Sequence, residues 1–164
     1  MEPVECEGGV IPLDPEWAKA AAKAAREAGA IVMCDEVQTG MGRCGSLMAN
    51  TALGIDPEVV TFAKAIAGGV PMGACIFKGK GNVFKAGDHQ STFAGNPLAC
   101  AAADVVLDTI TAPGFFESVS RACAPDASSG RIIQAYWDFT WGMEKKSPEY
   151  HKNTCQRAFC CLNM

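Results

Sequence analysis

Two side chains with complementary chemistry follow two short apolar runs of the sequence. Asp35 ends the run that begins at Ala30, and Lys64 comes just after the run from Val59 to Phe62. Both runs predict buried β-strands, and in parallel α/β sheets the functional groups gather at the carboxyl ends of the strands. We therefore expect a carboxylate and an amine at the same edge of one sheet.

Asp35 and Lys64 are the pair of groups that pyridoxal 5′-phosphate (PLP) chemistry requires. A lysine can bond to the cofactor's aldehyde, and a carboxylate can keep the pyridine nitrogen protonated so that the ring accepts electrons. An aspartate and a lysine at strand ends are also common without any cofactor, where they are solvated or form a salt bridge. Spacing alone favours this plainer explanation, so the assignment depends on the flanking residues.

The elements that must position this pair alternate between helices and short strands. Asp14 and Asn96 are each followed by a proline, and a capping residue before a proline is typical of a helix start. The expected helices cover residues 15–28, 46–53 and 97–110, and the expected strands cover residues 30–34, 59–62 and 74–77. This alternation predicts an α/β fold with a mostly parallel sheet and flanking helices.

Composition limits the classes of protein to which the chain can belong. Its 164 residues suit one ordinary domain, and 49% hydrophobic residues suffice for a sizeable core. A net charge of −4 gives no attraction to nucleic acid or to an anionic membrane. No apolar run is long enough to span a bilayer, and the N-terminus does not resemble a signal peptide. We expect a cytoplasmic protein.

The nine cysteines do not predict a metal site. Cys155, Cys160 and Cys161 lie near His151, but their spacing lacks the paired pattern of a zinc module. We expect free thiols in a reducing compartment, and no metal.

Four blocks of the sequence resemble the class III (ornithine-type) aminotransferases, and within that family the resemblance is greatest to the acetylornithine branch. They occur in the family's order, and together they are specific, although each alone would be only suggestive. The blocks are residues 2–10 (EPVECEGGV), 35–40 (DEVQTG), 61–64 (TFAK) and 91–100 (STFAGNPLAC).

The resemblance implies a fold and a division of the chain. Residues 1–113 would be part of the large PLP-binding domain of a fold-type I aminotransferase. Residues 114–164 match poorly and could be a degraded start of the small C-terminal domain.

The family also implies roles for individual residues. Lys64 would carry PLP through its amine and then act as the acid and base that moves the substrate's proton, and Asp35 would pair with the pyridinium nitrogen. Val37 would pack against one face of the ring, and Gln38 would hydrogen-bond the cofactor's phenolic oxygen.

Two further residues take roles from the family that depend on a partner or on the substrate. Thr92 would cross a dimer interface and bind the phosphate of the neighbouring subunit's cofactor. Glu7 matches a glutamate that pairs with an active-site arginine and helps the site alternate between substrates.

The implied activity is transamination within arginine biosynthesis. A homodimer would move an amino group from N-acetylornithine, or a related ω-amine donor, to 2-oxoglutarate. One alternative is a non-catalytic truncated remnant of such an enzyme. A weaker alternative is a small α/β nucleotide-binding module, since residues 40–45 formally match G-x-G-x-x-G. That motif should follow its strand at once and open a long helix, which the sequence does not predict here.

Several features depart from the family. The chain is far shorter than a complete subunit and lacks the upstream Gly/Thr/Glu/Ala-rich block that holds the cofactor phosphate. We therefore expect this chain alone not to complete transamination. Ala94 stands where the family usually has glycine, which would strain the loop if that position requires a positive φ.

Overall fold

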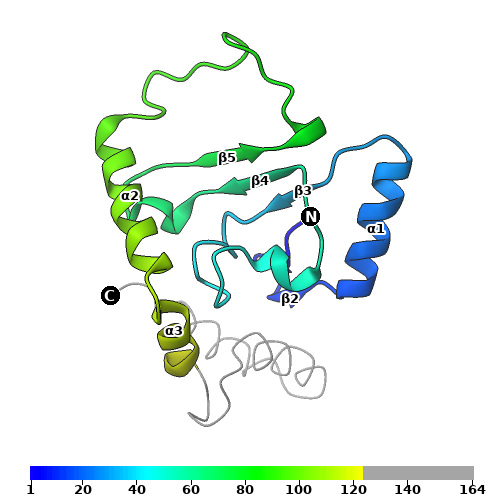
Figure 1. Cartoon of the computed structure of the whole chain (residues 1–164), viewed down its shortest axis with the longest axis horizontal. Helices are drawn as coiled ribbons and strands as arrows, with labels where there is room; N and C mark the ends of the chain where they lie inside the picture. The colour runs from blue at the N-terminus through cyan, green and yellow to red at the C-terminus, as the bar shows by residue number, and fades with distance from the viewer. Residues whose placement is uncertain (124–164) are drawn as a thin grey trace.

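The computed structural model describes residues 1–123, and Figure 1 shows a small sheet between two helices. The predictions made for His151 and the three tail cysteines, and for the tail beyond residue 123, lie outside the described residues.

A three-stranded sheet carries the two residues of the predicted pair. Its strands are β3 (Met33–Asp35), β4 (Val59–Phe62) and β5 (Ala74–Phe77), in the order β3-β4-β5. β3 and β4 are parallel, with Asp35 opposite Thr61, whereas β5 is antiparallel to β4. The α/β class is confirmed, but only one of the two strand pairings is parallel. The 11 residues between β4 and β5 hold only a 3₁₀ turn (η2, Lys64–Ala67), and such a connection reverses the chain instead of crossing over the sheet.

The two long helices begin where the sequence predicts them. In α1 (Pro15–Glu27) the Asp14 carboxylate accepts a hydrogen bond from Trp17 N at 2.8 Å. In α2 (Pro97–Thr111) the Asn96 side-chain oxygen accepts one from Ala99 N at 2.9 Å. Both contacts satisfy a backbone N–H that has no partner within its helix, and each proline follows its cap directly.

The structure differs from the sequence prediction in three elements. The predicted helix over 46–53 is only a 3₁₀ helix, η1 (Ala49–Leu53), and β3 begins at Met33, three residues later than expected. A nine-residue helix, α3 (Phe115–Cys123), occupies the start of the tail, where no clear periodicity is visible. Phe115 packs against the core next to Ile110, so tertiary contact supports a helix too short to be stable alone.

The remaining elements are short. A hairpin pairs β1 (Val4–Glu5) with β2 (Ile11–Pro12), and a 3₁₀ turn, η3 (Gly79–Gly81), follows β5. Met1 lies beside β3, as Figure 1 shows: its ammonium donates to Met33 O at 2.8 Å, and its carbonyl accepts from Asp35 N at 2.9 Å. The start of the chain therefore extends the ladder at the outer edge of β3.

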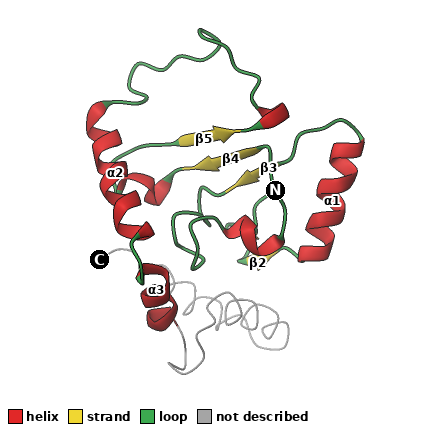
Figure 2. Ribbon diagram, viewed as in Figure 1, coloured by secondary structure: helices red, strands yellow, loops and turns green. Residues whose placement is uncertain are grey.

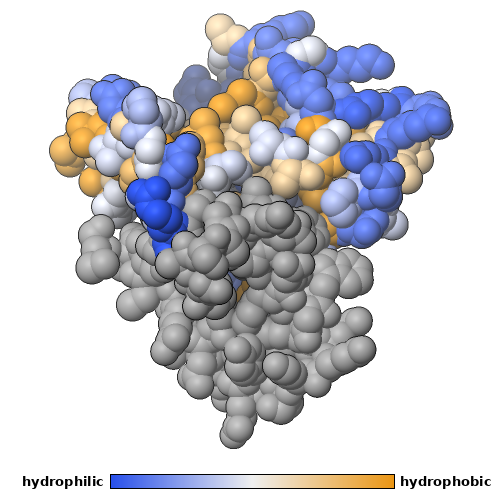
Figure 3. Space-filling view, turned by 60° about the horizontal axis from the view of Figure 1, so that its bottom comes forward, coloured by the Kyte–Doolittle hydropathy of each residue, from blue (hydrophilic) through white to orange (hydrophobic). Residues whose placement is uncertain are grey.

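Two apolar clusters hold the helices against the sheet. Cys34 packs with Ala18 and Ala22 of α1, whereas Val60 and Phe62 pack with α2. Figure 2 shows α1 and α2 at opposite sides of the three strands. In Figure 3 apolar side chains gather on the side of the molecule where α2 lies, and α2 exposes Leu98 and Val105. No helix among residues 1–123 is long and apolar enough to cross a membrane.

Ala94 does not have the positive φ that would strain its backbone. Within residues 1–123 the non-glycine residues with a positive φ are Val10, Met41 and Lys64, and in the 91–100 block the positive φ falls on Gly95, at 65°. The alanine therefore occupies a backbone conformation that a side chain tolerates.

Candidate active site at the ends of β3 and β4

Asp35 closes β3 and is held by two donors. Its Oδ1 accepts a hydrogen bond from Val37 N at 2.9 Å and one from Thr61 Oγ1 at 3.1 Å. Its other oxygen, Oδ2, accepts no hydrogen bond from any residue of the described part of the chain. A half-buried carboxylate with one fixed and one open oxygen suits a protonated ring nitrogen as its partner.

Lys64 begins η2, two residues after the end of β4, and its side chain is exposed. Because β3 and β4 are parallel and Asp35 lies opposite Thr61, the backbones of Asp35 and Lys64 leave the sheet at the same edge. None of the four ion pairs within residues 1–123 joins the two side chains. The plain salt bridge considered from the sequence is therefore not formed within residues 1–123.

The backbone of Lys64 has an unusual conformation. Its φ is +41°, a region that residues other than glycine seldom adopt. Such conformations cost roughly 1–3 kcal/mol and concentrate at functional sites. The sequence does not predict this strain, because a positive φ is usually marked by glycine and the TFAK block has lysine at that position.

The turn after β3 brings three other predicted residues together. Val37 and Gln38 are half-buried, and Gln38 Nε2 donates a 2.8 Å hydrogen bond to Glu7 Oε1. Glu7 is exposed in the turn between β1 and β2, so the contact joins the hairpin to the turn. No arginine takes part in this contact.

Thr92 does not join this group. It is exposed in the long connection between η3 and α2, which arches beyond β5 in Figure 1. A role toward a second subunit remains a prediction, as do the roles of the other five residues.

Sequence reasoning missed two residues that shape this edge. Thr61 fixes the Asp35 carboxylate, and Glu36 is a fully buried acid directly after it. Burial raises the pKa of Glu36; hydrogen bonds from the Thr39 hydroxyl and from backbone N–H groups oppose that rise, and the charge of Asp35 adds to it. Strand alternation could have indicated that Glu36 points away from the face that Asp35 uses.

The G-x-G-x-x-G match at residues 40–45 lies in a loop that only the short η1 follows, so no long helix opens there. Within residues 1–123, no group of three or more metal-binding side chains comes together.

Known proteins resemble this chain in sequence and in fold. An acetylornithine aminotransferase of Gloeobacter violaceus is 44% identical over 137 residues, which are 83% of this chain and 34% of that protein. The solved N-acetylornithine aminotransferase of Stenotrophomonas maltophilia has a TM-score of 0.63 at 36% identity, over 74% of this chain and 31% of that one.

An ornithine aminotransferase of Toxoplasma gondii, whose structure shows partial occupancy of PLP at its active site, has a TM-score of 0.67 at 32% identity, over 74% of this chain and 29% of that one. The chain thus spans about a third of the length of the curated relative from Gloeobacter violaceus. Class III aminotransferases are PLP-dependent enzymes. Residues 1–127 match the sequence profile of that family, and the chain belongs to the class III aminotransferases.

Proposed function

We propose that this chain carries the Lys64 and Asp35 part of a PLP-dependent transaminase. The enzyme would take an amino group from N-acetylornithine, or a related ω-amine donor, and give it to 2-oxoglutarate in arginine biosynthesis. The observation that carries the proposal is the pair at one sheet edge: an exposed lysine at a strained backbone position, and a fixed aspartate whose Oδ2 accepts no hydrogen bond from residues 1–123. The similarity to acetylornithine aminotransferases supports the choice of donor.

When bound, PLP supplies an electron sink for the reaction. Asp35 would hold a proton on the ring nitrogen through Oδ2, while Thr61 and the Val37 N–H keep Oδ1 in place. The Lys64 amine would bind the cofactor's aldehyde and afterwards carry the proton to and from the substrate carbon, a role that contributes about 10²–10⁴-fold in rate.

Val37 and Gln38 would complete the contacts of the ring from the turn that follows Asp35. Gln38 donates one amide N–H to Glu7, which leaves its second N–H for the phenolic oxygen of the cofactor. Thr92 would bind the cofactor phosphate of a neighbouring subunit, so the working protein would be a cytoplasmic homodimer.

The test is covalent trapping of the cofactor on the purified chain. Mixing with PLP, reduction with borohydride and peptide mass spectrometry should place one phosphopyridoxyl group on Lys64. Lys64→Ala should abolish this label, whereas Lys23→Ala, which removes an exposed lysine of α1, should leave it unchanged. A label spread evenly over surface lysines would contradict the proposal.

Turnover separates the proposal from the alternative that the chain is a non-catalytic remnant. Addition of N-acetylornithine to the loaded chain, followed by 2-oxoglutarate, tests whether the cofactor is converted to its amine form and back. We expect no complete cycle from this chain alone, which spans about a third of its curated relative, and a complete cycle would exclude the remnant. Specific labelling of Lys64 without either conversion would favour the remnant.

A further inference from the structure

Glu36 is a buried acid whose neighbours in sequence form the proposed site. It is 1% exposed, and it follows Asp35 directly. Its N–H donates to Thr61 O at 2.9 Å, which continues the β3–β4 ladder one residue past Asp35. Because side chains alternate along an extended chain, Asp35 and Glu36 leave the sheet on opposite faces.

The Glu36 carboxylate caps a helix that has no cap of its own. Its Oε1 accepts a 2.7 Å hydrogen bond from Asn50 N, in the first turn of η1. Met48, at the N-cap position of η1, offers no side-chain hydrogen bond. The first N–H groups of a helix have no partner within it, so the Glu36 carboxylate satisfies them from a distant part of the chain.

The backbone around Glu36 is equally constrained. The Thr39 hydroxyl donates to Glu36 Oε2, and Gly40 N donates to Glu36 O at 2.9 Å, which closes the 36–40 turn on itself. A Cβ atom on Gly40 would lie 2.8 Å from Glu36 O and 2.9 Å from Phe62 Cε1, so the turn is packed directly on β4. Both distances are shorter than a normal contact, so a side chain at position 40 would displace the turn or the Phe62 ring.

We propose that Glu36 is a positioning residue for the cofactor site: its buried carboxylate fastens the turn that carries Asp35, Val37 and Gln38 to η1. The inference rests on the proposed function, since it assigns Glu36 to the reaction that those residues would serve. Glu36 acts through the turn and does not itself face the edge where Lys64 lies.

A glutamine at position 36 provides the matched variant. Its amide oxygen can accept from Asn50 N, and its amide nitrogen can donate to the Thr39 hydroxyl, so Glu36→Gln keeps the shape and both hydrogen bonds. Glu36→Ala removes both contacts. Thr39→Val removes the hydroxyl that donates to Glu36 Oε2, at nearly constant side-chain volume. It replaces Glu36→Ala as the test variant if the alanine variant does not fold. Val32→Ala, in the cluster beside α1, controls for a general loss of stability.

The experiment combines amide hydrogen exchange of the full chain without PLP with PLP titration followed at Lys64. Glu36→Ala should speed exchange in the peptides covering residues 36–41 and 49–51 by about tenfold, the effect of a lost buried hydrogen bond, and weaken PLP binding by a similar factor. Thr39→Val should change both in the same direction by a smaller factor. Glu36→Gln should restore both to within about twofold of the wild type. Val32→Ala should speed amide exchange in α1 and β3 without weakening PLP binding.

Two results would overturn the inference. One is unchanged exchange of residues 36–41 in both Glu36→Ala and Thr39→Val. The other is a loosened turn that binds PLP as tightly as the wild type. A wild-type chain that shows no Lys64-dependent binding would instead refute the proposed function, and the exchange data alone would still decide whether Glu36 holds the turn.

Discussion

At the scale of the residue, Asp35 and Glu36 are adjacent acids in opposite surroundings. Asp35 is half-buried, and one of its oxygens accepts no hydrogen bond from the described part of the chain, while Glu36 is buried and both of its oxygens accept hydrogen bonds. Taking a carboxylate out of water is costly even when it is hydrogen-bonded. An ionised Glu36 is therefore less favourable in the folded chain than a neutral residue that makes the same hydrogen bonds.

This cost predicts a pH dependence. The pKa of Glu36 is raised above its ordinary value mainly by burial, so its contribution to stability is present at low pH and is lost as pH rises through the folded pKa. Glu36→Gln cannot titrate there. Its free energy of unfolding should therefore rise relative to that of the wild type between about pH 4 and pH 7.

Denaturant unfolding at several pH values measures this difference. Asp35 is the titratable group whose charge acts on Glu36. The charge of Glu36 in turn acts on the thiols of Cys34 and Cys44, and both thiols remain neutral in that range, since burial raises their pKa values to about 11 and about 12. Glu27→Gln, on the exposed face of α1, is the control. A constant difference across the range would show that burial of Glu36 is not the dominant effect.

At the scale of the element, a clamp joins the end of α1 to the start of β4. Arg26 Nε donates to Glu58 Oε1 at 2.8 Å, and Glu58 Oε2 accepts from Val32 N at 2.8 Å. The hydrogen bond from Arg26 is the first cause of the lowered pKa of Glu58. The clamp sets the position of the strand that leads to Lys64.

Glu58→Gln should weaken this clamp without removing its side chain. Because the pKa of Glu58 is lowered in the folded state, its stabilising effect is present above the ordinary glutamate pKa and is lost as pH falls through the lower folded value. We expect a loss of about 1 kcal/mol at pH 7, the upper end for partly exposed pairs, that shrinks below about pH 4.

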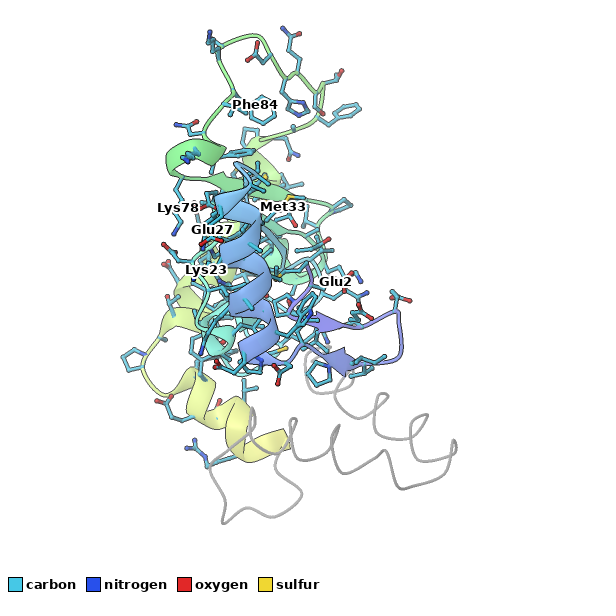
Figure 4. The ribbon with its side chains drawn as sticks, turned by 90° about the vertical axis from the view of Figure 1, so that its right-hand side faces the viewer. Glu2, Lys23, Glu27, Met33, Lys78 and Phe84 are labelled. Carbon is cyan, nitrogen blue, oxygen red and sulfur yellow. The ribbon has the colours of Figure 1, made fainter. Side chains whose placement is uncertain are left out.

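The exposed pair on α1 gives a matched comparison for urea unfolding. Figure 4 shows Lys23 and Glu27 on the same side of the helix, and their charged atoms are 3.8 Å apart. Glu27→Gln should change stability by no more than a few tenths of a kcal/mol. Equal effects of the two variants would mean that the Glu58 clamp contributes no more than a surface pair.

At the scale of the whole molecule, the core continues past the predicted domain boundary. Phe115 of α3 packs against the cluster that contains Phe62, Ala103 and Ile110, although residue 113 ends the first predicted unit. The family match likewise extends to residue 127. The packing supports placing α3 with the cofactor-binding unit, while the division itself remains a prediction.

Truncation tests where that unit ends. A chain ending at residue 113 should be less stable than one ending at residue 123 by about 2 kcal/mol, the value of burying one large apolar side chain. Thermal unfolding of the two chains measures the difference, and Phe115→Ala in the longer chain should reproduce most of it. Equal stabilities would confirm the boundary at residue 113.

The sequence by itself determined the elements whose signals are local. A capping residue and a proline start each long helix, and apolar runs mark β4 and β5 at the observed residues, because these signals act within a few neighbours along the chain. The motif blocks also identified the family. Only the tertiary structure decided the antiparallel β5, the reduction of residues 46–53 to η1, and the formation of α3.

The arrangement of the candidate site divides in the same way. Residue types indicated Asp35 and Lys64 but not the contacts around them. Thr61 holds the Asp35 carboxylate from 26 positions along the chain, and Glu36 accepts from Asn50 N across 14 positions. The first contact forms only when β3 and β4 pair, and the second only when η1 packs beside the 36–40 turn, so no local pattern encodes them.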